Sequence, residues 1–221
     1  MSDDLEREKQ LAAEAAASLV EDGMLLGLGT GTSADYFIRA VAALELDLQC
    51  IATSPASEEL AVSLGLDVRQ FEGPYAPAHL DLAVDGADQV AVDRWVVKGR
   101  GGAHTREKIV ATVAERFVVI VSSDKLVERV TAPIPLELLP FGLAATLVLL
   151  DDARLRDGAT RTPDDGVLAD YLGPVEDPAQ VAARLASTPG VVDHGLFPPE
   201  LVSDVIVGRG DEVEHLGGAR T

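Results

Sequence analysis

The chain has 221 residues, a formal net charge of −19 and an apolar content of 47%. Its 37 acidic residues outnumber 18 basic ones and are spread along the chain, which excludes an acidic tail and argues against binding to nucleic acid, because a phosphate backbone needs a basic face. The apolar content argues against intrinsic disorder. A dispersed acidic surface with few lysines instead predicts a halophilic protein, because high salt screens the self-repulsion of such a surface.

The sequence contains no run of about 18 apolar residues, the length that a membrane helix needs. Its first residues, MSDDLEREKQ, are acidic and do not resemble a secretory signal. Cys50 is the single cysteine, so it has no partner for an internal disulfide, and we interpret it as an inert strand residue in a reducing compartment. We therefore expect a cytoplasmic protein without a membrane or nucleic-acid partner.

Helical and strand patterns alternate through the first 122 residues. Apolar residues at helical spacing predict helices over 4–20 and 33–44. Ser54 as a cap and Pro55 in the first turn predict a third helix that ends near residue 64, before Gly65, and a fourth is expected over about 105–114. Short apolar runs predict strands at 24–28 and 48–53, at the start of LDLAVDGAD (80–88), and at FVVIVS (117–122). The last of these has no polar alternation, as expected for a strand buried on both faces of a parallel sheet. The order predicts an α/β fold with a doubly wound, mostly parallel (Rossmann-like) sheet.

The segment that follows is richer in proline and turn residues, and it holds one short predicted helix in DPAQVAARLASTPG. We interpret residues 131–202 as a smaller α+β domain. It is inserted into a Rossmann-like catalytic domain formed by residues 1–130 and 203–221, whose last strand is SDVIVG (203–208).

A glycine- and threonine-rich loop, GLGTGTSAD (27–35), follows the first predicted strand. Its glycines let the backbone approach a ligand, and Thr30, Thr32 and Ser33 offer hydroxyl groups beside a helix N-terminus, which together suit an anion. A dinucleotide fingerprint fails, because Thr32 replaces its third glycine and Thr53 stands where an acid is needed. A tight strand-to-helix turn explains this loop equally well.

The motif VDGAD ends the next strand and places Asp85 and Asp88 on either side of Gly86 and Ala87. Two close carboxylates can shift each other's pKa and carry out acid–base chemistry. Taken alone, Asp-Gly is more simply an ordinary turn.

The third motif, KGRGGAHTREK (98–108), joins Lys98 and a glycine-rich loop to a helix that carries Glu107 in its first turn. A glutamate there commonly stabilises the helix dipole, but it can also serve as a base. Lys125 follows the next strand, where a lysine is more often a surface residue. Because ligands bind at the carboxyl ends of parallel strands, we expect these motifs to form one site.

Together these motifs resemble ribose-5-phosphate isomerase, type A. The similarity runs in order along nearly the whole chain and rests on GTGTS (29–33), DGAD (85–88), KGRGGA…REK (98–108), Lys125 and PGVVDHGLF (189–197). It implies an aldose–ketose isomerase of the non-oxidative pentose phosphate pathway. Such an enzyme interconverts D-ribose 5-phosphate and D-ribulose 5-phosphate through an enediolate, as a homodimer or homotetramer.

The resemblance also implies residue roles. Glu107 is the base that moves a proton between C1 and C2, and Lys98 stabilises the enediolate with nearby backbone N–H groups. Asp85 and Asp88 assist ring opening and proton transfer between hydroxyl groups. The implied substrate-binding residues are Thr30, Gly31, Thr32, Ser33, Gly86, Ala87, Gly99, Arg100, Gly101, Lys125 and Lys9.

Neither a redox cofactor nor a metal is implied, and the four histidines show no paired ligand spacing. The sequence departs from the family pattern at Arg100, usually a glycine, at His104, commonly apolar, and in TPDDGVLAD (162–170). The alternative function is a non-catalytic sugar-phosphate sensor on the same fold. A sensor needs the anion site but neither Glu107 nor Lys98. A third alternative is an isomerase of another phosphorylated sugar.

Overall fold

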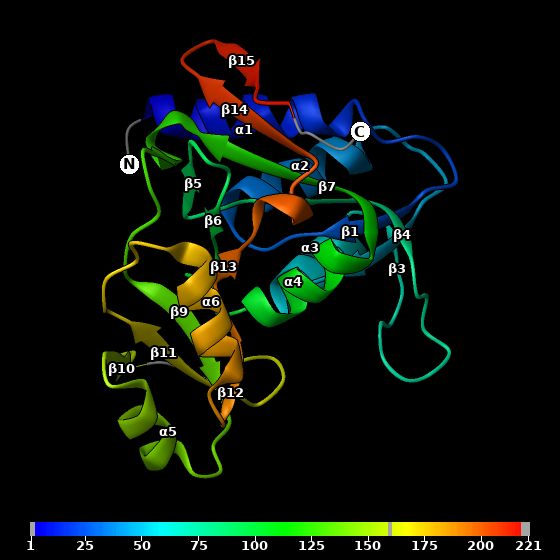
Figure 1. The fold of residues 1–221 in the computed structure, drawn as a ribbon. Coiled ribbons are helices and arrows are strands. Elements are labelled where there is room, and N and C mark those ends of the chain that lie inside the picture. Colours follow the sequence, from blue (N-terminus) through cyan, green and yellow to red (C-terminus); the bar gives the residue numbers. More distant parts are fainter. Residues whose placement is uncertain (1–2, 159–160, 218–221) are drawn as a thin grey trace. The chain divides into compact units, whose positions relative to one another are not determined.

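The computed structural model describes residues 3–158 and 161–217 of the chain (Figure 1). They form two compact units. Unit 1 comprises Met1–Ala87, Arg106–Lys125 and Glu200–Thr221, and unit 2 comprises Asp88–Thr105 and Leu126–Pro199. The sequence predicts residues 88–105 and 126–130 in the larger domain, but they belong to unit 2, because the short strands that they contain pair within that unit. Residues 200–202, predicted in the small domain, belong to unit 1.

Unit 1 contains a seven-stranded sheet in the order β15-β14-β7-β4-β1-β2-β3. Every neighbouring pair in it is parallel except the hairpin of β14 with β15 at one edge. The strands are β1 (Leu25–Leu28), β2 (Gln49–Ala52), β3 (Asp67–Val68), β4 (Leu80–Asp85), β7 (Ala114–Ser122), β14 (Asp204–Arg209) and β15 (Glu212–His215). The edge strand β15 was not predicted, since its four residues are all exposed and carry no apolar pattern.

Helices cover both faces of this sheet; they are α1 (Asp3–Ala17), α2 (Thr32–Ala42), α3 (Pro55–Ser63) and α4 (His104–Val113). On one face, α1 and α2 share an apolar cluster with alternate strand residues such as Leu26 and Leu28. Gly27 points to the other face, where a Cβ atom would lie 2.6 Å from a methyl group of Val110 in α4. Figure 1 shows α1 running beside β14 and β7. The predicted doubly wound, mostly parallel α/β fold is confirmed.

Unit 2 holds two small sheets. One is antiparallel, in the order β10-β11-β9-β12, and consists of β9 (Ile134–Leu138), β10 (Ala153–Leu155), β11 (Val167–Tyr171) and β12 (Val191–His194). The other has the order β13-β6-β5-β8 and consists of β5 (Gln89–Ala91), β6 (Val96–Val97), β8 (Leu126–Val127) and β13 (Leu196–Phe197). Short strands and turns alternate here as expected for an α+β unit.

Two helices complete unit 2, α5 (Leu143–Leu150) and α6 (Pro178–Ser187). The second is the helix predicted in DPAQVAARLASTPG, and it begins with Asp177 accepting a hydrogen bond from Gln180 N–H and with Pro178 in the first turn. The sequence does not predict the first, because LAATLVLL is apolar except for Thr146 and has no helical period.

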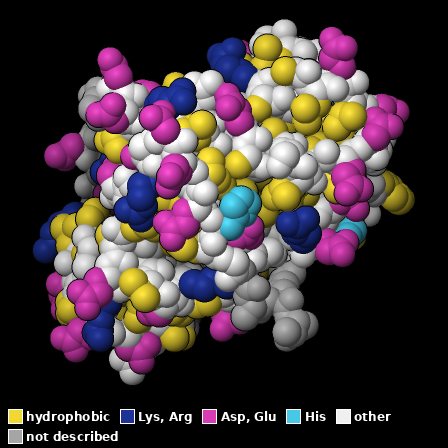
Figure 2. Space-filling view, turned by 90° about the horizontal axis from the view of Figure 1, so that it is seen from above, with side chains coloured by type: hydrophobic (Ala, Val, Ile, Leu, Met, Phe, Trp, Pro, Cys, Tyr) yellow, Lys and Arg dark blue, Asp and Glu magenta, His cyan; other side chains and the backbone are white. Residues whose placement is uncertain are grey.

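Acidic side chains lie scattered among apolar and basic ones over the face that Figure 2 shows, in agreement with their dispersal along the sequence. Among the helices formed by residues 3–158 and 161–217, none has the length and apolar character needed to cross a membrane.

Candidate active site

The glycine-threonine loop of unit 1 follows β1 and is tied to the neighbouring strand β4. Gly29 N–H donates to Val84 O at 3.0 Å. A Cβ atom on Gly29 would lie 2.1 Å from the carboxyl group of Asp85, so only glycine fits this position. Gly31 has a φ of 95°, in the region that favours glycine, and directly precedes α2. The glycines of this motif therefore serve close packing and a turn.

Asp85, the last residue of β4, is 3% exposed. Its Oδ1 atom accepts hydrogen bonds from Thr30 N–H at 3.0 Å and from Gly86 N–H at 2.7 Å. Gly86 in turn lies close to Ser33, since a Cβ atom on it would be 3.5 Å from the Ser33 Cβ. The first two sequence motifs are thus adjacent in unit 1, as predicted from their positions after neighbouring strands.

The N-terminus of α2 has the features of an anion-binding site. No side chain caps this helix, whereas Ser54 accepts a hydrogen bond from Ser57 N–H at the start of α3. Thr32, which carries a hydroxyl group, is the first residue of α2. Thr30 anchors the preceding loop, with its Oγ1 atom 2.8 Å from Thr53 Oγ1. These donors suit a phosphate group.

Two lysines of the predicted site lie in unit 1, and each is paired with an acid. Lys125 ends the short 3₁₀ turn η1 (Ser123–Lys125) after β7, with its Nζ atom 3.0 Å from Asp124 Oδ2. Lys9 of α1 is 7% exposed, and its Nζ atom lies 2.8 Å from Glu6 Oε1. The hydrogen bond from Lys9 lowers the pKa of Glu6, so this carboxylate is charged at neutral pH and stabilises the buried ammonium group.

Glu107 lies in the first turn of α4 and is 4% exposed. A glutamate that only favours the helix dipole would be expected at the surface. The burial of this side chain therefore supports the alternative interpretation from the sequence, a carboxylate held for acid–base chemistry. His104 and Thr105 of α4 belong to unit 2, and the helix continues in unit 1 from Arg106.

Lys98 lies in unit 2 and is 3% exposed. Its N–H group donates to Gly195 O at 2.9 Å, and its Nζ atom lies 5.7 Å from the centroid of the Phe197 ring. Both partners belong to the late motif PGVVDHGLF. The electron-rich ring face favours the ammonium group in this dry position. The motif thus supports the lysine, a relation that the sequence alone does not show.

The glycine loop after Lys98 is closely packed. Gly99 has a φ of 112°, and a Cβ atom on it would lie 2.7 Å from His104 Nδ1. His104 is fully buried, so the departure from an apolar residue at this position places an imidazole directly under the loop. Gly102, with a φ of 77°, lies similarly close to Leu168. The loop therefore has little room to change its path.

Asp88 opens unit 2 and is hydrogen-bonded to this loop, since its Oδ2 atom accepts from Arg100 N–H at 2.9 Å. Arg100 stands where the family usually has a glycine, and it makes this hydrogen bond with its backbone N–H group. The Arg100 side chain is exposed, and no residue in the described part of the chain accepts a hydrogen bond from its guanidinium group. Arg100 lines a hollow in the surface of unit 2 together with Asp88, Arg156 and Asp170, so this departure adds a cationic side chain beside the loop.

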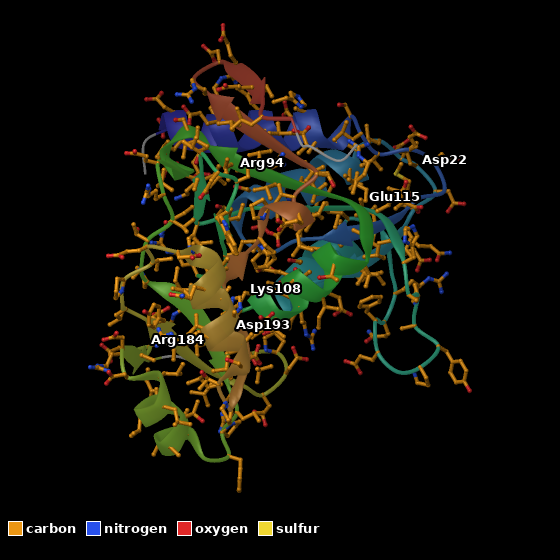
Figure 3. The ribbon with its side chains drawn as sticks, in the orientation of Figure 1. Asp22, Arg94, Lys108, Glu115, Arg184 and Asp193 are labelled. Atoms are coloured by element: carbon orange, nitrogen blue, oxygen red, sulfur yellow. The ribbon has the colours of Figure 1, made fainter. Side chains whose placement is uncertain are left out.

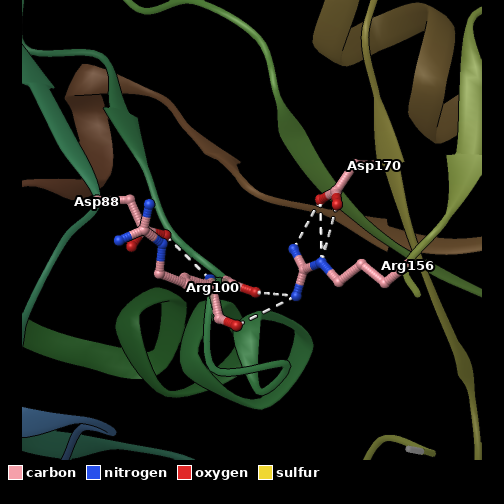
Figure 4. A network of polar contacts seen from close by, with 5 residues as sticks. Asp88, Arg100, Arg156 and Asp170 are labelled. Carbon is pink, nitrogen blue, oxygen red and sulfur yellow. Dashed lines mark hydrogen bonds and ion pairs between the residues drawn. The ribbon is translucent and has the colours of Figure 1, made fainter. Parts of the chain in front are cut away.

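The sequence missed Arg156 and Asp170, which form an ion pair beside the loop (Figure 4). It also missed Glu8, a buried carboxylate of α1 that holds Ser123 next to Lys125. No sequence motif predicts these contacts, because strand pairing and helix packing bring the partners together.

Residues 3–158 and 161–217 contain one group of side chains arranged so that they could hold a metal ion, His79, Asp81 and Glu115. Asp81 lies near the start of β4, at the opposite end of this strand from Asp85, and Glu115 (labelled in Figure 3) lies near the start of β7. His79 and Glu115 are exposed. This group is therefore separate from the candidate catalytic residues.

A mostly parallel sheet covered by helices on both faces defines a Rossmann-like α/β protein, a class in which small ligands bind at the carboxyl ends of the strands. Comparison with known proteins identifies the family within this class. Residues 49–212 match the family model of ribose 5-phosphate isomerase A (phosphoriboisomerase A). The chain therefore belongs to this family.

Individual relatives agree over nearly the full length. The ribose-5-phosphate isomerase A of Halobacterium salinarum is 41% identical over 220 residues, which cover 93% of this chain and 94% of the relative. The solved structure of ribose 5-phosphate isomerase A from Methanocaldococcus jannaschii has a TM-score of 0.87 and 32% identity, covering 95% of this chain and 97% of the other. A D-ribose-5-phosphate isomerase solved in complex with phospho-erythronic acid has a TM-score of 0.89 and 31% identity, covering 98% and 100%.

Proposed function

We propose that this chain is an aldose–ketose isomerase that interconverts D-ribose 5-phosphate and D-ribulose 5-phosphate. The observation that carries the proposal is the burial of Glu107 and Lys98, at 4% and 3% exposure, in a chain that belongs to the family along nearly its whole length. A buried base and a buried ammonium group are required to move a proton and stabilise the resulting oxyanion. A protein that only binds the sugar phosphate requires neither.

Proton transfer is assigned to Glu107. Its carboxylate removes the proton from C2 of the open-chain aldose, the C2–H electron pair forms the C1–C2 double bond, and the carbonyl electrons move to O1. The proton of the C2 hydroxyl group then passes to O1, the O2 electrons form the C2=O double bond, and the electron pair of the C1–C2 double bond takes the proton from the same carboxyl group at C1, which gives the ketose. Because hydrogen stays within the substrate and its carboxyl carrier, this chemistry requires no redox cofactor.

The enediolate oxygens carry negative charge, and Lys98 is assigned to stabilise it. The hydrogen bond from the backbone N–H of Lys98 to Gly195 O fixes its main chain, and the Phe197 ring contacts its ammonium group. The residue is therefore held before the substrate binds, and little reorganisation is needed during the reaction. The glycine loop that follows supplies backbone donors. The related isomerase that binds phospho-erythronic acid supports this assignment, because the carboxylate of a sugar acid, like an enediolate, presents two oxygens that share negative charge.

Asp85 and Asp88 are assigned to ring opening and to proton transfer between the hydroxyl groups. Each carboxylate is oriented by backbone N–H groups, Asp85 by Thr30 and Gly86, and Asp88 by Arg100. The phosphate is assigned to the N-terminus of α2 with the loop at Thr30–Ser33, and to Lys125 and Lys9. Gly86, Ala87, Gly99, Arg100 and Gly101 complete the proposed substrate-binding set with their backbone.

The test is the formation of D-ribulose 5-phosphate from D-ribose 5-phosphate, measured in molar KCl with EDTA present. Turnover is the expected result. A folded protein that binds ribose 5-phosphate without turnover would instead indicate a sugar-phosphate sensor. Turnover of a different phosphorylated sugar alone would correct the substrate.

We further propose that the chain assembles as a homodimer or homotetramer. Around α5, apolar side chains are open to solvent, with Phe141 92%, Val148 79% and Leu149 60% exposed. An apolar surface of this kind typically marks a protein interface, and a second copy of the chain is the expected occupant. Analytical ultracentrifugation of Val148→Glu should show a lower oligomer than the unmodified chain. An unchanged mass would place the interface elsewhere.

We also propose that the protein works in a cytoplasm rich in salt. The net charge of −19 and the dispersed acidic surface support a salt-adapted protein, and one buried free cysteine fits a reducing compartment. The midpoint of thermal unfolding should rise between 0.1 M and 2 M KCl if surface repulsion limits stability at low salt.

A further inference from the structure

Arg156 connects a carboxylate on one side to two backbone carbonyls on the other, all within unit 2 (Figure 4). Its Nε atom lies 3.1 and 3.0 Å from the two carboxylate oxygens of Asp170, and its Nη2 atom lies 2.7 Å from Oδ1. Its Nη1 atom donates to Gly99 O at 3.0 Å and to Arg100 O at 3.2 Å. One guanidinium group therefore joins the antiparallel sheet to the loop that follows Lys98.

The sheet side of this connection is rigid. Arg156 directly follows β10, and its N–H group donates to Leu168 O of β11 at 3.2 Å. Asp170 lies in β11, where it pairs with Pro135 of β9 on one side and with Arg154 of β10 on the other. Both side chains are largely buried, at 19% and 21% exposure. An ion pair with two-point geometry in this setting holds the guanidinium group in one orientation.

The loop side has a geometric consequence. In a trans peptide unit the C=O and N–H groups point in opposite directions. Because the carbonyls of Gly99 and Arg100 point toward Arg156, the N–H groups of Arg100 and Gly101 point away from it. Arg100 N–H is the donor that Asp88 accepts at 2.9 Å. Arg156 thus orients the peptide unit that holds a proposed catalytic carboxylate.

We propose that Arg156, held by Asp170, is a positioning residue for the reaction: by bonding the carbonyls of Gly99 and Arg100 it fixes the two peptide units on either side of Arg100, so that the Arg100 N–H group donates to Asp88. The proposal rests on the proposed function, which gives this loop its role. Arg156 does not need to contact the substrate. It acts through the loop backbone, which bonds Asp88 and which directly follows Lys98, the lysine proposed to stabilise the oxyanion.

Arginine is required for this role because a single planar group must bond a carboxylate along one edge and two carbonyls with its remaining nitrogen. A lysine ammonium group has three donors but no fixed planar arrangement, so Arg156→Lys keeps the charge and loses the geometry. A displacement of a catalytic group by about 1 Å can cost on the order of 10²-fold in rate. We therefore expect kcat of Arg156→Lys to fall by about 10- to 100-fold, with a smaller change in KM.

The test compares Arg156→Lys with Arg154→Lys in the full-length protein. Arg154 is a matched control because it lies in β10, two residues away, and donates to the carbonyls of Asp151 and Ala153 but not to the loop. Steady-state kcat and KM and the midpoint of thermal unfolding are measured for both. The expected result is a loss of kcat in Arg156→Lys alone, with both proteins folded at the assay temperature.

Two further measurements separate positioning from general stability. In Arg156→Ala, added guanidinium ion at millimolar concentration should restore part of the lost kcat and leave Arg154→Ala unaffected. Asp170→Asn, which keeps the side-chain volume, should lower kcat in the same way. The double variant Arg156→Lys, Asp170→Asn should lose little more than either single one, because the two side chains act as one unit.

The outcomes are distinct. If the unmodified protein turns over ribose 5-phosphate and Arg156→Lys keeps kcat within about twofold of it, the positioning role is wrong while the function stands. The positioning role is also wrong if two results occur together. The first is that the loss of kcat in Arg156→Lys, Asp170→Asn and the Arg154 control is proportional to the fall in each variant's midpoint of thermal unfolding. The second is that guanidinium ion restores no activity. If the unmodified protein has no turnover, the proposed function itself fails.

Discussion

Thr30 and Asp85 are 55 residues apart in the sequence and are joined by a hydrogen bond of 3.0 Å from the Thr30 N–H group to the Asp85 Oδ1 atom. The bond links the loop proposed to hold phosphate to a carboxylate proposed to move protons. It is made possible by Gly29, whose missing side chain leaves the space that the Asp85 carboxyl group fills. The proposed phosphate site and the proposed acid–base group of unit 1 therefore depend on the same close contact.

Gly29→Ala should damage both properties. The added methyl group would lie 2.1 Å from the Asp85 carboxyl group, so either the loop or the carboxylate must move. Overpacking of this kind typically lowers the free energy of unfolding by about 1–3 kcal/mol. We expect that loss together with at least a tenfold fall in kcat/KM. Gly217→Ala is the matched control, since nothing lies within 4 Å of a Cβ atom there. Full activity in Gly29→Ala would show that Asp85 need not occupy this position.

Glu107→Gln tests the base directly. The amide keeps the shape of the buried side chain but cannot accept the C2 proton, so kcat should fall by at least about 10²-fold, as is typical when an acid–base group is removed. Binding of ribose 5-phosphate, measured by calorimetry, should stay within about threefold of the unmodified protein. Glu115→Gln, in the exposed start of β7, is the control and should retain full turnover. A Glu107→Gln protein with near-normal kcat would mean that another group moves the proton.

The sequence predicts those parts of the fold that rest on local patterns. In β7 the residues VVIV are buried without polar alternation, and β1 and β4 are short apolar strands that lead into loops with distinctive residues. Because parallel strands end at a common edge, the pairing of Thr30 with Asp85 follows from their positions after β1 and β4. The α/β class and the contact between the first two motifs could therefore be predicted from the sequence.

The missed features depend on tertiary contacts. Arg156 and Asp170 meet because β10 and β11 pair in one particular register, and nothing in DGATRTPDDG indicates it. Residues 88–105 belong to unit 2 because β5 and β6 pair with β8 and β13, strands of only two residues that are too short to show a period. From the sequence alone, Glu8 is one of several acidic residues on a charged helix. Only the packing of α1 shows that it is buried.

Glu8 should make the stability of the protein sensitive to acid. Its carboxylate accepts hydrogen bonds of 2.8 Å from Ser123 N–H, from the Ser123 hydroxyl and from Gly210 N–H. Burial acts to raise its pKa, but the bonds from Gly210 and Ser123 outweigh it, so the pKa lies below the ordinary value of 4.5. A lowered pKa in the folded state means that the ionised group stabilises the fold at neutral pH, and that this contribution is lost as the pH falls through the folded-state pKa.

Glu8→Gln should therefore lower the free energy of unfolding at pH 7 by about 1–3 kcal/mol, the cost of weakening a buried, charge-assisted set of hydrogen bonds. The difference from the unmodified protein should shrink as the pH is lowered below the ordinary glutamate range. Urea unfolding at a series of pH values measures this difference. Glu14→Gln, at an exposed position of the same helix, should show almost no difference at any pH. A Glu8→Gln difference that is independent of pH would mean that packing, not charge, is responsible.

Cys50 should be unreactive in the folded protein despite the absence of a disulfide. It is buried in β2, and desolvation, with a smaller contribution from the charge of Asp67, raises the pKa of its thiol to about 12. The thiolate is the reactive form, so at pH 8 both its population and its access to a reagent are small. A disulfide reagent such as dithionitrobenzoate should react at the rate of unfolding and rapidly in 6 M guanidinium chloride. Rapid modification of the folded protein would show that the sheet opens locally at β2. This strand pairs with β1, which precedes the loop proposed to bind phosphate, so loss of activity on modification would connect that opening to the proposed site.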